Sequence, residues 1–581
     1  MTEVLAVNSQ AEHAVSAAMA RVLPRGLAGR DPLVRPSEHA DFQSNAAMAL
    51  AGAAGLAPRE LAERLKQELA GEAALEVTVS GPGFLNLTVP DHRLWAQAAD
   101  RLAAPRLGAG RPLAGSRVVV DYSGPNIAKE MHVGHLRSNV IGDALARALG
   151  FLGAEVIRQN HLGDWGTQFG MLIQYLAEHP EHPWREGTAA ERISLLDALY
   201  KAARQLFEAD QEFAERSRLR VVALQGGDPA TTAVWQELIA VSGTAFQQLY
   251  DRLGLLLTPA DTDGESGYND ELPALARELV EAGIAVESEG ALCVFFDDLV
   301  GPQGEPVPLI VRKQDGGYGY QASDLATIRH RVRDLGADRI LYVVDARQAL
   351  HFRMVFAAAR RAGWLPESVE AVHVPFGMVM GPGGTPFKTR SGGTVRLAGL
   401  LDAAVDAVRA VMAEKEGELT GAESERVAQA AGIGAVKYAD LSTSRARNYV
   451  FDVEQMVSLS GNTGVYLQYA HARVRSILAK AGEEPAAVDP AQPLHPVERA
   501  LVLLLDGFDA TVREVAQELE PHRLCGYLFA LAKAFTDFYG ACPVLKAAPG
   551  LRGNRLALCR LSAETLALGL DLLGLQAPER I

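Results

Sequence analysis

The sequence has few cysteines and no long apolar run. Its four cysteines, Cys293, Cys525, Cys542 and Cys559, form no C-x-x-C pair and no dense framework. This excludes a disulfide-stabilised secreted domain and predicts reduced, structural thiols. No apolar stretch approaches the roughly 20 residues that span a bilayer. Glu3 stands near the start, where a signal peptide carries positive charge, and this predicts a cytoplasmic protein.

The sequence also has fewer basic than acidic residues. The formal net charge of −15 excludes a protein that coats nucleic acid nonspecifically, although it leaves room for a local basic surface. The pattern G-x-x-x-x-G-K-[ST] occurs nowhere, so a P-loop is excluded as a nucleotide site.

The length and the Pro/Gly-rich breaks predict several domains. At about 100 to 200 residues per domain, the chain has room for three or four, and its hydrophobic content of 48% is typical of folded proteins. Breaks near residues 110, 183, 304, 383 and 490 separate the patterned segments. They predict domains at 1–110, at 111–395 with an insertion at about 180–305, and at 396–581.

The hydrophobic patterns predict an α/β multidomain fold. The alternating stretch at 75–89 turns at Gly81-Pro82-Gly83, which indicates a hairpin in a small N-terminal α/β domain. Strand, helix and strand patterns follow one another from residue 117 and again from 339. Together they predict a Rossmann-type, doubly wound parallel sheet that is split by the insertion. After residue 400 strand signals vanish, and helical periodicity predicts an all-α helical bundle.

Two histidines, His132 and His135, lie where a predicted strand gives way to a helix. They have three candidate roles. A metal site, with His161 as a third ligand, is disfavoured because no cysteine completes a zinc set. Packing in the core is the second alternative. Phosphate binding suits the position better, since a helix N-terminus favours anions and Gly134 has no side chain to hold a phosphate away.

The motif His132-Val133-Gly134-His135 resembles the His-Ile-Gly-His motif of class I aminoacyl-tRNA synthetases, and SGPNIAKEMHVGHLRS resembles its arginyl-tRNA synthetase form. The resemblance extends in order over the whole chain, including PGFLNLTV in the N-terminal domain. The further matching segments are NHLGDWGTQFGMLI (160–173), YQASDLATIRHR (320–331), YVVDARQALHF (342–352), FKTRSG (387–392), YLQYAHARVRSIL (466–478) and EPHRLCGYLFALAKAFTDFYGACPV (520–544).

The resemblance implies an arginine–tRNA ligase that uses ATP with Mg²⁺ as its substrate complex and needs no structural metal. Arginine would attack the α-phosphorus of ATP, and the arginyl group would then pass to the 3′ end of tRNA(Arg). Catalysis would rest on alignment and on charge stabilisation, with His132 and His135 donating to phosphate oxygens. The implied ATP-binding residues are His132, Gly134, His135, Lys388, Thr389, Arg390 and Ser391.

The second ATP loop departs from the family pattern. Phe387-Lys388-Thr389-Arg390-Ser391 stands where members commonly have Lys-Met-Ser-Lys-Ser, so Arg390 occupies the place of the second lysine. Lys129, just before the histidine motif, is a candidate to supply the missing ammonium. The alternative is that these charges are solvated, but the flanking glycines favour a mobile loop.

Arginine selection requires carboxylates that match a planar guanidinium. By resemblance, Asp324 and Glu265 would bind the guanidinium and Tyr320 would close the pocket. The implied residues for the amino and carboxylate end are Asp121, Ser123, Asn126, His135 and Gln348.

The tRNA contacts implied by the resemblance lie in two regions. The N-terminal domain would meet the tRNA elbow through Phe84 and Asn86, although the same alternation suits a plain hairpin. The helical region would serve as stem and anticodon-binding domain, although its arginines also suit an amphipathic exterior. Its candidates are Arg445, Arg447, Asn448, Tyr449, His471, Arg473 and Arg475.

Two other functions compete. A related class I adenylate-forming ligase with a small acceptor would have no use for a helical RNA-binding bundle. A noncatalytic tRNA-binding paralogue would have lost the paired histidines or Asp324, which are present. We expect a monomer, as the family resemblance implies.

Overall fold

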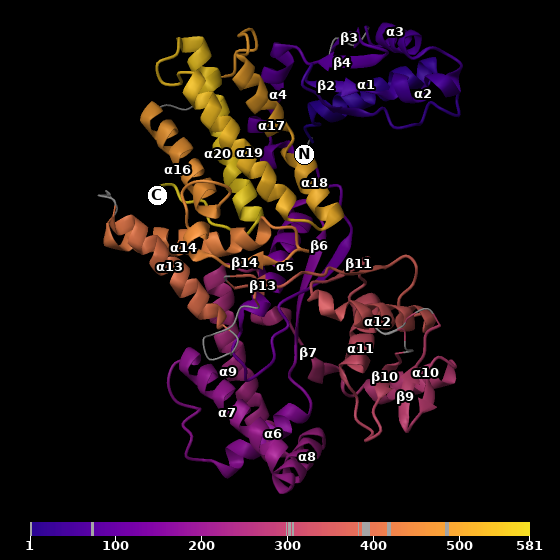
Figure 1. Ribbon diagram of the computed structural model, residues 1–581, viewed down its shortest axis with the longest axis vertical. Coiled ribbons are helices and arrows are strands. Elements are labelled where there is room, and N and C mark those ends of the chain that lie inside the picture. Colours follow the sequence, from indigo (N-terminus) through magenta and orange to yellow (C-terminus); the bar gives the residue numbers. More distant parts are fainter. Residues whose placement is uncertain are drawn as a thin grey trace.

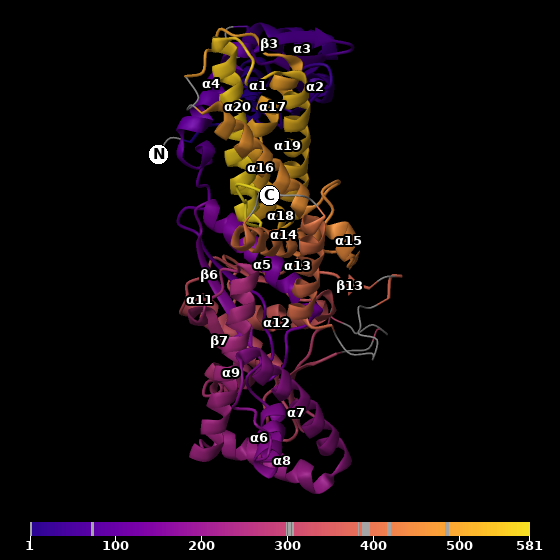
Figure 2. The ribbon, with the colours of Figure 1, turned by 90° about the vertical axis from the view of Figure 1, so that its left-hand side faces the viewer.

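The computed structural model describes residues 3–70, 75–297, 299, 304, 307–381, 383–385, 395–414, 420–482 and 487–581. The molecule is elongated, with the N-terminal segment at one end and helices α6 to α9 at the other (Figures 1 and 2). Among the described helices, none combines the length and the apolar character needed to cross a membrane.

The N-terminal segment forms a small α/β unit around a four-stranded antiparallel sheet in the order β1-β2-β4-β3. The predicted hairpin is confirmed, since β3 and β4 pair across the Gly81-Pro82-Gly83 turn. Its elements are α1 (Val7–Val22), β1 (Val34–Pro36), β2 (Phe42–Ser44), α2 (Ala46–Ala54), α3 (Pro58–Leu69), β3 (Glu76–Ser80), β4 (Phe84–Thr88) and α4 (Asp91–Ala103).

The central sheet has five strands in the order β12-β11-β5-β6-β7, and every neighbouring pair is parallel. The chain starts the sheet at β5, adds β6 and β7 on one side and then β11 and β12 on the other. This is the predicted doubly wound arrangement, with the switch point between β5 and β11. The elements are β5 (Arg117–Asp121), α5 (Val133–Phe151), β6 (Glu155–Leu162), β7 (Thr262–Gly264), β11 (Arg339–Tyr342), α12 (Ala349–Arg361) and β12 (Glu370–His373).

The chain between β6 and β7 is a helical insertion at the lower end of the molecule (Figure 1). Between β7 and β11 lies a second excursion with the small antiparallel sheet β10-β9-β8. The helices of the first are α6 (Thr167–Glu178), α7 (Ala189–Ala209), α8 (Gln211–Gln225) and α9 (Pro229–Leu253). The second contains α10 (Leu272–Glu281), β8 (Val286–Ser288), β9 (Ala291–Val294), β10 (Leu309–Arg312) and α11 (Tyr320–Arg333).

The last third is helical, as predicted, with one exception. The prediction that strands vanish after residue 400 is wrong at β14 (Tyr449–Val450), which pairs in parallel with β13 (Val379–Met380). A two-residue strand is too short to leave a period-two pattern in the sequence. The helices are α13 (Leu397–Ala413), α14 (Gly421–Leu441), α15 (Val453–Met456), α16 (Gly464–Ala481), α17 (Pro496–Asp506), α18 (Phe508–Glu518), α19 (His522–Ala541) and α20 (Pro549–Leu572).

Asp506, at the end of α17, joins the N-terminal unit to the helical bundle. Its carboxylate accepts hydrogen bonds from the Val7 backbone N–H at 2.6 Å, from Gln97 at 2.7 Å and from Arg101 Nε at 2.5 Å. The Asp506 and Arg101 side chains are almost fully buried, at 4% and 2% exposure. A buried ion pair of this kind is costly to break, because removing one charge leaves the other unpaired.

Replacing Asp506 by asparagine is therefore expected to lower the free energy of unfolding by about 3–5 kcal/mol. Urea-induced unfolding should show a transition at clearly lower denaturant. Glu3→Gln is the matched control, since Glu3 pairs with Arg513 of α18 between the same two parts, but 45% of its side chain is exposed. That change should cost no more than about 1 kcal/mol. If the two substitutions lowered the free energy of unfolding equally, the Asp506 ion pair would not be a special source of stability at this contact.

Candidate active site

The histidine motif lies at the switch point of the central sheet. The chain leaves β5 at Asp121 and enters α5 at Val133, next to the carboxyl end of β11. In open α/β sheets ligands bind outside the carboxyl ends of the strands at this place. Ser123 and Ala128 have φ angles of 79° and 61°, which non-glycine residues rarely adopt, so the connecting segment is strained.

The two histidines cap the helix that they begin. His132 is the N-cap of α5, and its Nδ1 accepts the Gly134 N–H at 3.0 Å. His135 Nδ1 accepts the His132 N–H at 3.1 Å in return. Because both Nδ1 atoms are acceptors, each neutral ring carries its proton on Nε2. A Cβ at Gly134 would lie 2.7 Å from His132 Cε1, so glycine is required to keep this ring in place.

Both histidines are held neutral. Burial lowers the pKa of His135 to about 3, with the charges of His132 and Lys129 acting in the same direction. Burial also lowers the pKa of His132. The charge of Asp197 opposes this, and the positive charges of Lys129 and Arg347 add to it. At neutral pH the pair therefore offers two Nε2–H donors without carrying charge, an arrangement suited to developing phosphate charge.

The segment that follows the second predicted ATP loop is fastened to the histidine motif. The Val133 N–H donates to Val395 O and the Leu397 N–H donates to Met131 O, both at 3.0 Å. Arg396 also pairs with Glu130 at 2.7 Å. The predicted residues Lys388, Thr389, Arg390 and Ser391 lie outside the described residues.

Lys129 lies near both histidines, and its ammonium sits over the Tyr200 ring of α7, with Nζ 4.3 Å from the ring centroid. This contact ties the ammonium to the helical insertion. Its predicted action on ATP stays a prediction.

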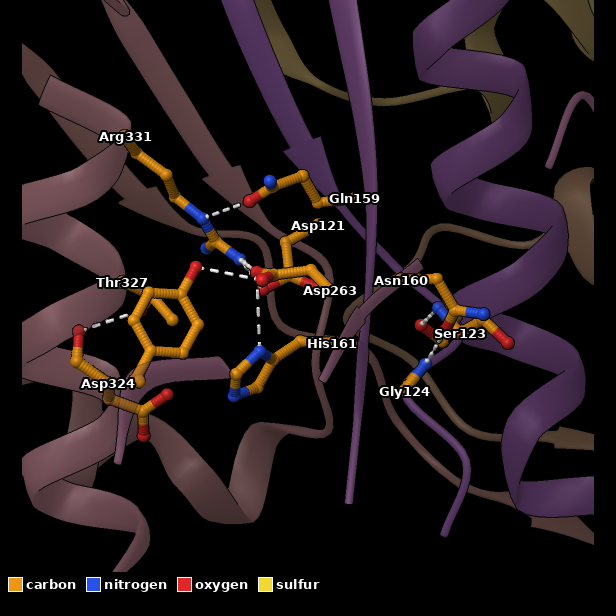
Figure 3. Close-up of polar contacts among 12 residues, drawn as sticks. Asp121, Ser123, Gly124, Gln159, Asn160, His161, Asp263, Asp324, Thr327 and Arg331 are labelled. Carbon is orange, nitrogen blue, oxygen red and sulfur yellow. Dashed lines mark hydrogen bonds and ion pairs between the residues drawn. The ribbon is translucent and has the colours of Figure 1, made fainter. Parts of the chain in front are cut away.

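A second polar cluster lies at the ends of β5, β6 and β7 (Figure 3). Fully buried Arg331 pairs with Asp121 at 2.8 Å and with Asp263 at 3.4 Å, and its Nε donates to Gln159 at 2.6 Å. His161 Nδ1 lies 3.4 Å from Asp263 Oδ2. Asp121, which was predicted to hold the amino end of arginine, thus has an ion-pair partner that the sequence pattern did not reveal.

The surroundings of His161 favour its protonated form. Burial alone would lower its pKa, but the close contact with Asp263 and the charges of Asp121 and Asp324 raise it to about 9. The metal alternative that used His161 as a third ligand finds no support, since this imidazole faces Asp263 and not the histidine pair. The cluster therefore holds two cations, Arg331 and His161, among several carboxylates.

Asp324 and Glu265 are two further carboxylates beside this cluster. Asp324 is mostly buried, and its Oδ2 lies 2.6 Å from His351 Nε2. Within the described chain no side chain or backbone group hydrogen bonds to the Glu265 carboxylate. Burial, with the charges of Asp324 and Asp164, raises its pKa to about 7, although His161 acts in the opposite direction. An almost unpaired buried carboxyl beside another carboxylate favours a cationic ligand.

Hydrogen bonds from neighbouring elements hold the strained segment after Asp121 in place. Ser123 Oγ lies 2.7 Å from the Tyr250 hydroxyl of α9, and the Gly124 N–H donates to Asn160 Oδ1 at 3.0 Å. Asn160 in turn donates to the same Tyr250 hydroxyl at 3.1 Å. Ser123 is buried, whereas Asn126 is exposed. Ser123 therefore holds the segment in place, and Asn126 is the one that is open to a ligand.

Tyr320 and Gln348 are both exposed. Tyr320 is 53% exposed, and its ring packs beside His351 at 5.0 Å between centroids. Gln348 is exposed at the start of α12. The predicted closure by Tyr320 is not seen in this conformation.

The predicted tRNA residues of the helical region divide into buried and exposed side chains. Tyr449 is buried against Arg137, and the Arg445 guanidinium donates to Leu519 O and Pro375 O, both at 2.9 Å. These contacts argue against both as tRNA ligands. Arg447 and Asn448 are exposed, although Asn448 Oδ1 accepts the Met378 N–H at 2.7 Å.

Arg473 is exposed on α16 and its guanidinium lies 5.3 Å from the Tyr539 ring centroid, which gives a basic and aromatic surface. His471 is buried, and its Nδ1 lies 3.0 Å from Pro578 O, whereas Arg475 pairs with Glu579 at 2.5 Å. In the N-terminal sheet Asn86 accepts from Gln43 at 2.7 Å. Phe84 is half-buried over the Gly81 turn.

Several residues in and around the second polar cluster were not found from the sequence. Asp263 and Arg331 were missed because nothing in a local pattern distinguishes a buried ion pair from surface charge. Asp164, whose carboxylate accepts from Ser266 N at 2.8 Å and Ser266 Oγ at 2.7 Å, positions the Glu265 turn.

Three family descriptions match the chain. The catalytic domain of class I (R) tRNA synthetases matches residues 107–453, the DALR anticodon-binding domain matches 467–581, and the arginyl-tRNA synthetase N-terminal domain matches 9–89. An arginine–tRNA ligase of Frankia casuarinae is 63% identical over 99% of this chain and 98% of its own length. One of Thermobifida fusca is 52% identical over 95% of each.

Solved structures similar to this chain come from the same family as the sequence relatives. The arginyl-tRNA synthetase of Plasmodium falciparum has a TM-score of 0.84 at 26% identity and covers all of both chains. The Thermus thermophilus arginyl-tRNA synthetase has a TM-score of 0.81 at 27% identity over 99% of this chain and 100% of its own.

Proposed function

This chain belongs to the arginyl-tRNA synthetase family, a class I family of arginine–tRNA ligases, and from this we propose how its residues divide the reaction. The enzyme joins arginine to tRNA with ATP as energy source. His132 and His135 present their Nε2–H groups to ATP phosphate oxygens, where negative charge grows as the arginine carboxylate attacks. Gly134 keeps His132 in position and lets the phosphate approach the N-terminus of α5.

In this proposal the second ATP loop acts with the histidines. The hydrogen bonds of Val395 and Leu397 to the motif support the assignment of Lys388, Thr389, Arg390 and Ser391 to pyrophosphate. Mg²⁺ enters with ATP as part of the substrate. Lys129 is assigned to the same phosphates, which requires its ammonium to leave the Tyr200 ring.

Glu265 and Asp324 receive the guanidinium, and this pair is the observation that carries the proposal. Both are largely buried, and the Glu265 carboxyl has a pKa raised to about 7. A guanidinium binds two carboxylates as a planar fork. Asp121 stabilises the pocket through Arg331 and faces the amino end of the substrate with Asn126 and Gln348.

The remaining assignments concern partners and domains. The N-terminal unit meets the tRNA elbow through Phe84 and Asn86, and the helical part binds stem and anticodon, with Arg447, Asn448 and Arg473 as contacts. Residues 1–110, 111–395 and 396–581 are the proposed domains. The enzyme is placed in the cytoplasm and acts as a monomer.

Arginine-dependent exchange of pyrophosphate into ATP tests the proposal. Exchange is expected with arginine and tRNA(Arg) together and not with another amino acid. Exchange should need the tRNA, as the family resemblance implies. Exchange supported equally by lysine would contradict the carboxylate assignment, because lysine lacks the planar fork.

The raised pKa of Glu265 predicts a pH-dependent affinity for arginine. A cationic ligand favours the carboxylate form, and in the free protein this form is lost as pH falls through about 7. Affinity therefore approaches its full value near pH 8 and falls as the pH drops through 7. Linkage to this single group gives a Kd roughly tenfold higher at pH 6 than at pH 8. Isothermal titration of arginine at both pH values measures the change.

Glu265→Gln should bind arginine more weakly and lose the pH dependence over this range. The control is Glu271→Gln, since Glu271 is an exposed carboxylate that pairs with Arg329 at 2.6 Å. It should keep the wild-type pH profile. A wild-type Kd that does not change between pH 6 and pH 8 would rule out Glu265 as the titrating group.

A further inference from the structure

A cluster of potential metal ligands lies far from the histidine motif, at the end of α6 in the helical insertion. His179, Glu181 and His182 each direct one ligand atom into a common space, and these atoms all lie within 4.8 Å of one another. His179 Nδ1 is 3.1 Å from Glu181 Oε1, and His182 Nε2 is 3.9 Å from the same oxygen. Such atoms lie roughly 3.3 Å apart around a tetrahedral zinc. Small side-chain rotations would complete three ligands.

The local structure holds the two imidazoles in this arrangement. Tyr175, one turn earlier on α6, packs on both rings, with centroid distances of 4.3 Å to His179 and 6.2 Å to His182. Pro180, between His179 and Glu181, and Pro183, directly after His182, restrict the backbone that carries the ligands. The Trp184 side chain is buried, and the Trp184 backbone N–H donates to His182 O at 2.9 Å, so the turn is anchored in the insertion. The ligands are therefore largely pre-positioned.

The electrostatic setting favours a cation. His179 is the C-cap of α6, where the helix dipole places negative potential. The neighbouring Glu178 is paired with Arg216 at 2.7 Å, so it balances a charge elsewhere. Because all three ligands are between 33% and 63% exposed, a metal would keep at least one position open to water.

We infer that His179, Glu181 and His182 form a site for a divalent transition-metal ion of the zinc class. Two imidazoles and one carboxylate suit Zn²⁺ or Co²⁺, whereas Mg²⁺ and Ca²⁺ prefer oxygen ligands alone. A bound ion would fasten the end of α6 to the chain that leads into α7. The site departs from the sequence analysis, which predicted no structural metal.

Zinc titration of the full-length protein, followed by competition with a chromogenic chelator, tests the site. The wild type is expected to bind one Zn²⁺ that the double variant His179→Ala/His182→Ala does not bind. His182→Gln alone should weaken this binding at least tenfold. The matched control is His522→Ala, since His522 Nδ1 lies 2.9 Å from Glu520 and is similarly exposed, but has no second histidine beside it. It should leave the binding unchanged.

A second readout separates this site from other histidines. Co²⁺ bound to the wild type should give the visible absorption of a low-symmetry site, and saturating Zn²⁺ should raise the unfolding midpoint, both absent in the double variant. Circular dichroism verifies that the variant is folded. Identical zinc isotherms for wild type and double variant would overturn the inference, and so would an equal loss in His522→Ala.

Discussion

His132→Asn is expected to lower arginine-dependent ATP–pyrophosphate exchange by about 10²–10³-fold while leaving the protein as stable as the wild type. Asparagine is a preferred N-cap, and its side-chain oxygen replaces Nδ1 as acceptor of the Gly134 N–H. The variant therefore keeps the helix start and loses only the Nε2–H donor. Exchange at saturating arginine, ATP and tRNA, together with a thermal unfolding curve, measures both effects.

The chain offers a matched control for this substitution. His495 is the N-cap of α17, where its Nδ1 accepts the Val497 N–H at 3.4 Å in a capping box of the same type. His495→Asn should change neither stability nor exchange. If His132→Asn retains exchange within threefold of the wild type, then the histidine is a helix cap and not a phosphate ligand.

The fold was largely predictable because its patterns are local. The hairpin at 75–89 alternates with a period of two, and the two strand–helix–strand units each carry buried runs of the right length. The pairing of strands that lie far apart in the sequence could not be predicted from local patterns. The β13–β14 pair joins residues about seventy apart in sequence, and neither strand is long enough to leave a pattern.

The site was predicted less completely, for a physical reason. The histidine pair lies next to a helix start, so its role follows from neighbouring residues. Arg331 and Asp121, by contrast, are 210 positions apart in sequence and meet only because α11 packs beside the sheet. A sequence shows which side chains carry charge, but burial decides which of them pair with each other and which remain for a ligand. Tyr449 and Arg445 illustrate the same limit, since Tyr449 packs against Arg137 and Arg445 donates to Leu519 O within the fold.

Asp324→Asn is expected to raise the Kd for arginine by a factor between roughly 30 and several thousand. This corresponds to about 2–5 kcal/mol for removing one partner of a desolvated charge pair. The side chain keeps its size, so its contact with His351 and the packing of α11 are retained. Isothermal titration of arginine gives the affinity, and the KM for ATP should stay unchanged because the phosphate site is separate.

Asp334→Asn is the matched control, because Asp334 is the C-cap of the helix that carries Asp324 and also pairs with a histidine, His330, at 2.7 Å, but 65% of its side chain is exposed. It should leave arginine binding unchanged. Citrulline, which has the planar end group without its charge, gives a sharper test of the mechanism. If Asp324 acts by charge, the substitution weakens the binding of arginine far more than the binding of citrulline. The ratio of the two Kd values then moves closer to one. An equal loss for both ligands would mean that Asp324 shapes the pocket but does not recognise the guanidinium charge.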